Sequence, residues 1–74
     1  MSSREQAALK RFGKTLQSQR KRAGLTQEQL AEFCDFDPTY ISLLERGKRN
    51  PSLIAMTNLA HSLKCKVEDL VDGM

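Results

Sequence analysis

The segment that decides the fold spans residues 25–52 and reads LTQEQLAEFCDFDPTYISLLERGKRNPS. Thr26 stands three residues before Gln29, which is the spacing of a capping box that opens a helix. Asp37 followed by Pro38 is an N-cap with proline at the first helical position, and it opens a second short helix that Gly47 ends. Two short capped helices joined by a tight turn predict a helix-turn-helix over about residues 26–47.

Similar signals mark helices on either side of this segment. Ser3 precedes Gln6 at capping-box spacing, apolar residues follow at helical intervals to Ala23, and Gly24 offers a left-handed stop. After the segment, Ser52 is expected to cap a helix whose buried stripe would be Leu53, Met56, Leu59, Ala60 and Leu63. A last short helix would bury Val67, Leu70 and Val71. Since no alternating strand pattern is present, we predict an all-α, five-helix fold in one domain over residues 1–74.

The composition excludes several classes of protein. A chain of 74 residues and 8.4 kDa allows one small domain. No apolar stretch approaches the roughly 18 residues that a membrane span needs. The start, MSSRE, also lacks the apolar core of a signal peptide. We therefore expect a cytoplasmic protein with no membrane partner, in which Cys34 and Cys65 stay reduced.

The net charge of +3 conceals a strong pattern along the chain. Residues 1–27 carry seven Lys or Arg and one acid, residues 28–45 carry five acids and no base, and residues 46–49 carry three bases. The pI is near 9.1, and basic clusters on such a chain are compatible with a polyanionic partner. Taken alone, basic clusters are more often solvated surface.

The second helix of the helix-turn-helix has an outward face suited to the DNA major groove. With Ile41 and Leu44 facing inward, a rotation of 100° per residue turns outward Thr39, Ser42, Leu43 and Arg46, with Pro38 at the flank. The major groove admits one α-helix, and methyl groups of Thr39 and Leu43 could pack on thymine methyls. The alternative for Leu43 is an ordinary exposed leucine, and base contact is the favoured interpretation. Because the face carries few long amides or guanidiniums, we expect DNA shape to contribute to specificity.

Phosphate contacts are expected at both ends of this motif. Gln27 and Thr39 lie at helix N-termini, where backbone N–H groups and the helix dipole favour anions. Just beyond the second helix comes a basic loop, suited to an adjacent phosphate backbone: Arg46, Lys48, Arg49 and Asn50. Tyr40 has two interpretations, a phosphate contact through its hydroxyl or a cover for the turn beside Phe36.

The stretches LTQEQLAE (residues 25–32) and YISLLERGKRNPS (residues 40–52) resemble the phage-repressor/Cro-type helix-turn-helix family, also called the xenobiotic-response-element family. The resemblance runs from about Leu9 to Leu70. It implies five helices and binding to double-stranded DNA, commonly as two-fold dimers on palindromic or pseudo-palindromic operators. The implied function is transcriptional regulation, and the chain most resembles the small controller proteins of restriction–modification systems.

The resemblance also assigns roles to individual residues. It implies that Gln27 touches phosphate and that Pro38, Thr39, Ser42 and Leu43 occupy base-reading positions. It implies an interior salt bridge between Arg20 and Glu45, which would tie the first helix to the third.

Three positions depart from the family pattern. Asp35 stands in the inter-helix turn where a left-handed glycine is customary, and aspartate tolerates that conformation better than most residues. Lys64 stands where a second glycine is customary, and nothing in the sequence compensates for it. Lys66 is a poor N-cap for the last helix.

A homodimer is expected, because a single recognition helix reads only a few base pairs. The candidate dimer surface is the C-terminal apolar stripe, Leu63, Cys65, Val67, Leu70 and Val71. These side chains have another interpretation, in which they close the core of the single chain over the first helix.

Catalysis and metal binding find no support in the sequence. His61 and Cys65 stand at i, i+4, but two ligands do not make a zinc site. Neither a phosphate-cradling glycine loop nor a Ser/His/Asp arrangement is present, so we expect no enzyme, metal, cofactor or small-molecule ligand. The alternative function is a helical protein-interaction module, a bridging or antitoxin-like factor, which an exposed Leu43 and the acidic stretch 28–45 would favour.

Overall fold

The structure is a computed structural model that describes residues 2–72. It contains α1 (Ser3–Arg22), α2 (Gln27–Cys34), α3 (Pro38–Glu45), α4 (Leu53–Leu63) and α5 (Val67–Val71), and no strand within the described residues. The predicted all-α class with five helices is confirmed. None of the helices in this part of the chain is both long and apolar enough to cross a membrane.

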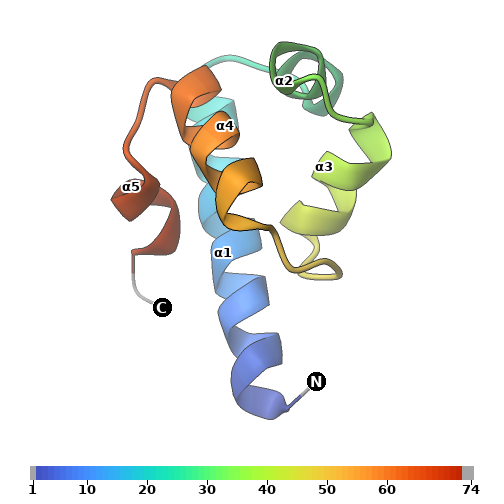
Figure 1. The fold of residues 1–74 in the computed structure, drawn as a ribbon, viewed down its shortest axis with the longest axis vertical. Coiled ribbons are helices and arrows are strands. Elements are labelled where there is room, and N and C mark those ends of the chain that lie inside the picture. Colours follow the sequence, from blue (N-terminus) through green and yellow to red (C-terminus); the bar gives the residue numbers. More distant parts are fainter. Residues whose placement is uncertain (1, 73–74) are drawn as a thin grey trace.

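The helices pack around the long α1 (Figure 1). Helix α3 lies on one side of α1 and α5 on the other, while α2 packs on both α3 and α4. The fully buried large side chains come from all five helices and form one cluster: Phe12, Leu16, Leu30, Ile41, Leu44, Leu59 and Leu70. This shared core fixes α2 and α3 against the rest of the molecule.

Side-chain caps set the start of each of the first four helices. The Thr26–Gln29 box is confirmed, with Gln29 N donating to Thr26 Oγ1 (3.1 Å) and Thr26 N to Gln29 Oε1 (2.9 Å). Asp37 caps α3 with Pro38 at its first turn, and Ser52 caps α4, both as predicted. At α1 the predicted cap is one residue too late. Ser2 is the N-cap, because Glu5 completes the box in place of Gln6.

The predicted buried stripe of α4 is wrong at its N-terminal end. Leu53 is 68% exposed and Met56 is only half-buried, whereas Ala55 is buried. The inward row of α4 is Ala55, Leu59 and Leu63, spaced by four residues, with Ala60 beside it. Leu53 precedes Leu59 by six residues, which turns it well away from this row.

Two turns use left-handed residues that are not glycine. Asp35 (φ 58°) ends α2 and Lys64 (φ 56°) ends α4, at the two positions where glycine is customary. For a residue with a Cβ this conformation costs about 1–2 kcal/mol. At the next helix Lys66 provides no side-chain cap, as its residue type predicts, although its own backbone N–H donates to Asp69 Oδ2 at 2.9 Å.

Candidate nucleic-acid interface

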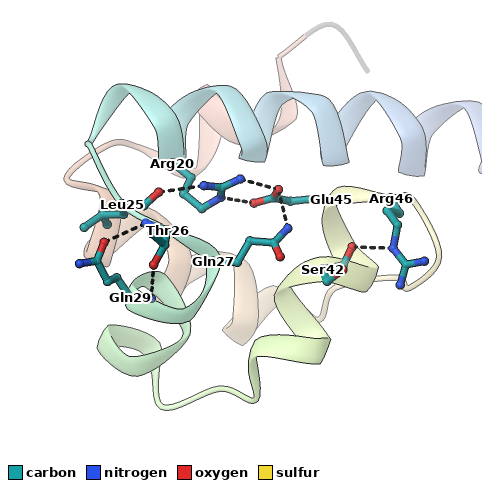
Figure 2. Close-up of polar contacts among 8 residues, drawn as sticks. All are labelled: Arg20, Leu25, Thr26, Gln27, Gln29, Ser42, Glu45 and Arg46. Carbon is teal, nitrogen blue, oxygen red and sulfur yellow. Dashed lines mark hydrogen bonds and ion pairs between the residues drawn. The ribbon is translucent and has the colours of Figure 1, made fainter.

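The centre of the site is a buried ion pair between the first and third helices (Figure 2). Arg20 Nε donates to Glu45 Oε2 at 2.6 Å, and a second guanidinium nitrogen donates to Glu45 Oε1 at 3.0 Å. The Glu45 side chain is only 2% exposed. The hydrogen bonding of its guanidinium to the Glu45 carboxylate is the main cause that raises the pKa of Arg20. A bidentate, buried pair of this kind holds the end of α3 against α1.

The same carboxylate also holds the beginning of α2. Gln27 Nε2 donates to Glu45 Oε1 at 3.0 Å, and the remaining guanidinium nitrogen of Arg20 donates to the Leu25 carbonyl at 2.8 Å. Three segments of the chain therefore converge on Glu45 (Figure 2). Gln27, predicted to touch phosphate, is half-buried, and the second N–H of its amide can still donate.

The side chains on the outward face of α3 differ in their exposure to solvent. Pro38, Thr39 and Arg46 are exposed, while Ser42 and Leu43 are half-buried. The backbone N–H of Thr39 is occupied, because it donates to Asp37 Oδ1 at 2.8 Å. A phosphate contact at Thr39 would therefore have to use its side chain, since the cap already carries a negative charge at this helix start.

Tyr40 covers the turn and also reaches the basic loop. Its ring meets Phe36 edge-to-face, with centroids 5.2 Å apart at 83°. The guanidinium carbon of Arg49 lies 5.7 Å from the Tyr40 centroid, which is cation–π range. The contact with Phe36 matches the second interpretation of Tyr40. The contact with Arg49 was not predicted, since nothing in the sequence places a loop residue over that ring.

The basic loop begins directly at the end of α3. Gly47 (φ 71°) turns the chain, and the backbone N–H groups of Gly47 and Lys48 donate to the carbonyls of Leu44 and Leu43. Arg46 Nε donates to the Ser42 carbonyl at 3.4 Å (Figure 2). The loop exposes Lys48, Arg49 and Asn50. The structure thus gathers the predicted DNA-binding residues on the start of α2, on α3 and on this loop.

The residues predicted for a dimer surface do not form one exposed stripe. Leu63 and Leu70 lie in the core, 7% and 0% exposed, and only Cys65, Val67 and Val71 are accessible in part. The large exposed apolar side chains are elsewhere: Phe33, Leu53 and Ile54, each 66–69% exposed. Leu53 and Ile54 were not predicted as surface candidates, because the predicted buried stripe of α4 included Leu53.

Cysteine and histidine do not assemble a metal site within residues 2–72, where no group of three or more His, Cys, Asp or Glu could hold an ion. The Cys34 thiol is buried and donates to Ser62 Oγ (3.2 Å), and burial raises its pKa. The sulfur is thus a packed core group.

Comparison with known proteins identifies the same motif. A family model described as helix-turn-helix matches residues 16–70. The control protein C.BamHI of Bacillus amyloliquefaciens is 40% identical over 62 residues, covering 82% of this chain and 76% of that protein. An uncharacterized transcriptional regulator of Sinorhizobium fredii, y4dJ, is 42% identical over 52 residues, covering 70% of this chain and 68% of that protein.

A solved structure extends the likeness to the fold. The restriction-modification controller protein C.AhdI from Aeromonas hydrophila superposes with a TM-score of 0.84 at 39% identity. The match covers 86% of this chain and 97% of that one. Fold and sequence therefore point to the same set of relatives.

Proposed function

The chain belongs to the helix-turn-helix family of DNA-binding transcriptional regulators, and on that premise we propose that α3 reads base edges in the major groove while the following loop binds phosphate. In this proposal Pro38, Thr39, Ser42 and Leu43 face the bases. Phosphate is bound by the start of α2 and by the loop: Gln27, Arg46, Lys48, Arg49 and Asn50. The ring of Tyr40 supports Arg49 through the cation–π contact, and Tyr40 does not itself need to touch DNA.

The observation that carries the proposal is the convergence of three segments on Glu45. A helix that reads bases must be held at a fixed angle to the elements that grip the backbone. Here one buried carboxylate binds Arg20 of α1 and Gln27 of α2 at the end of α3. Motion of α3 relative to the start of α2 would break the hydrogen bond from Gln27. Motion of α3 relative to α1 would break the ion pair and leave a buried charge unpaired, which is costly.

The side chains of α3 favour contacts with thymine methyl groups and recognition of DNA shape over recognition of bases by hydrogen bonds. The methyl group of Thr39 and the half-buried Leu43 can pack on thymine methyl groups, and Ser42 can donate to or accept from either base of a pair. None of these forms a bidentate pair with a base. We therefore assign part of the specificity to Arg46 and Arg49 at flanking positions and to deformation of the duplex.

The proposal includes a homodimer on a palindromic or pseudo-palindromic operator. Two half-sites centred about one helical turn apart would double the number of base pairs read. We place the contact between copies at Leu53 and Ile54. They are exposed apolar residues that follow the basic loop in sequence, whereas α5 lies across α1 from α3 (Figure 1). The half-buried set Cys65, Val67 and Val71 is the alternative surface.

The narrower role that we propose is control of a restriction–modification operon. Its support is the likeness to the control protein C.BamHI and to the controller protein C.AhdI. The proposal assigns the chain a binding role without catalysis, exercised in the cytoplasm. It predicts that the preferred DNA sequence occurs upstream of genes for a restriction enzyme or a DNA methyltransferase.

Selection from random duplex DNA at about 0.15 M salt tests the proposal, because non-specific phosphate attraction is partly suppressed there. We expect enrichment of an inverted repeat with half-sites about one turn apart. A folded helical protein that enriches no sequence would overturn the proposal. Enrichment of a single half-site would support base recognition by α3 but contradict the proposed homodimer.

A further inference from the structure

The basic loop rests directly on α1 at Lys10. A Cβ built on Gly47 would lie 3.0 Å from Lys10 Cγ and 3.1 Å from both Cα and N of the same residue. The loop backbone therefore touches both the main chain and the side-chain stem of Lys10. Gly47 is separated from Lys10 by most of α1, α2 and α3, so this contact is a product of the fold alone.

A second glycine holds α1 and the end of α3 together next to this contact. A Cβ built on Gly13 would overlap the Glu45 carbonyl oxygen and lie 2.6 Å from that of Leu44. A glycine inside a helix lowers stability by roughly 0.5–1 kcal/mol relative to alanine, yet here only glycine lets the two backbones meet. Lys10 thus stands at a fixed position beside the first residues of the loop.

The charge of Lys10 has no ion-pair partner among residues 2–72. Lys10 is exposed, and Glu45 at the end of α3, where the loop begins, is paired with Arg20. Lys10 therefore adds a cation to those of the loop: Arg46, Lys48 and Arg49. A lysine whose stem is packed and whose ammonium group is free can bind phosphate as a point charge.

We infer that Lys10 is a further DNA-contacting residue, which binds the phosphate strand that the basic loop engages and so extends the interface from α3 onto α1. The inference rests on the proposed function. With α3 in the major groove, the loop meets one flanking strand, and a cation that touches the loop faces the same strand.

The test measures the salt dependence of binding to the duplex most enriched in the selection, for wild type, K10Q, K10R and R11Q. Arg11 is exposed, adjacent in the helix and of equal charge, but it is rotated by 100° away from Lys10. R11Q therefore controls for net charge. Each lost phosphate contact lowers the magnitude of the slope of log K against log salt by about 0.9.

K10Q is expected to lower the slope by about 0.9 and to weaken binding roughly fivefold at about 0.15 M salt. K10R should match wild type and R11Q should leave the slope unchanged. If K10Q and R11Q shift binding equally while wild type binds with a steep slope, the inference is wrong and the proposed function stands. If the wild-type protein enriches no duplex, both the inference about Lys10 and the proposed function are wrong.

Discussion

Gln27 and Glu45 are joined by a hydrogen bond of 3.0 Å, from the first residue of α2 to the last residue of α3. Because Arg20 of α1 binds both oxygens of the same carboxylate, Glu45 links the start of α2, which we propose to face phosphate, to α1 and to α3, which we propose to face the bases. The position of α2 relative to α3 therefore depends on one buried side chain, Glu45. Its removal should therefore affect both stability and binding.

Replacing Glu45 by alanine is expected to lower the free energy of unfolding by about 3–5 kcal/mol, since it leaves Arg20 buried without its partner. Urea denaturation followed by circular dichroism measures the loss. The double variant R20M/E45M is the control, because exchanging both charges for apolar groups removes the uncompensated charge. A loss for E45A below about 1 kcal/mol would contradict the structural role of the pair.

Replacing Arg46 and Arg49 together by alanine should weaken DNA binding and lower the slope of log K against log salt by about 1.8, as expected for two phosphate contacts. Fluorescence anisotropy over a salt series measures both quantities. K21A/R22A removes the same charge from exposed positions on α1 and serves as the control. Equal slopes for the two double variants would show that Arg46 and Arg49 do not meet phosphate.

Substitutions at Tyr40 separate its two possible roles, the packing of its ring and a phosphate contact through its hydroxyl. Y40F keeps the ring that meets Phe36 and Arg49 and removes only the hydroxyl, so binding should match wild type within about twofold. Y40L removes the aromatic contacts and should lower the free energy of unfolding by about 1 kcal/mol. A several-fold loss of affinity in Y40F would assign the hydroxyl to phosphate instead.

Lys64 offers a stabilising substitution. At φ 56° a side chain is strained, so K64G should raise the free energy of unfolding by about 0.5–1 kcal/mol after the greater chain entropy of glycine is counted. Lys66 has an extended backbone (φ −94°) and is the matched control, where glycine should destabilise. Equal effects of K64G and K66G on the urea midpoint would argue against strain at Lys64.

The proposed dimer contact is tested by making Leu53 and Ile54 polar. Because both side chains are about two-thirds exposed in the single chain, L53S/I54S should leave helical content unchanged and shift sedimentation toward the monomer. V71S, on the alternative surface, should sediment like wild type. A reversal of these two results would move the interface to α5.

Local signals in the sequence predicted most of the fold. The caps at Thr26, Asp37 and Ser52 were predicted correctly, because a capping side chain and its target N–H lie within three residues. The start of α1 was placed one residue late, because Ser2–Glu5 and Ser3–Gln6 have the same spacing. The orientation of Leu53 was wrong, since the many apolar residues of α4 allow more than one stripe.

The geometry of the candidate site was predictable only in part. The outward residues of α3 follow from helical periodicity once Ile41 and Leu44 are placed inward. The contacts of Arg49 with Tyr40 and of Gly47 with Lys10 depend on how the loop returns across the fold. Such contacts are set by tertiary packing, and no spacing along the chain encodes them.

The most direct test of the account is to repeat the random-duplex selection with T39Q beside wild type. Thr39 is exposed at the start of α3, and glutamine can bind adenine through two hydrogen bonds. If α3 reads bases, the two proteins should enrich inverted repeats of the same spacing that differ at one or two base pairs in each half-site. Identical enriched sequences would contradict the assignment of this face of α3 to base recognition.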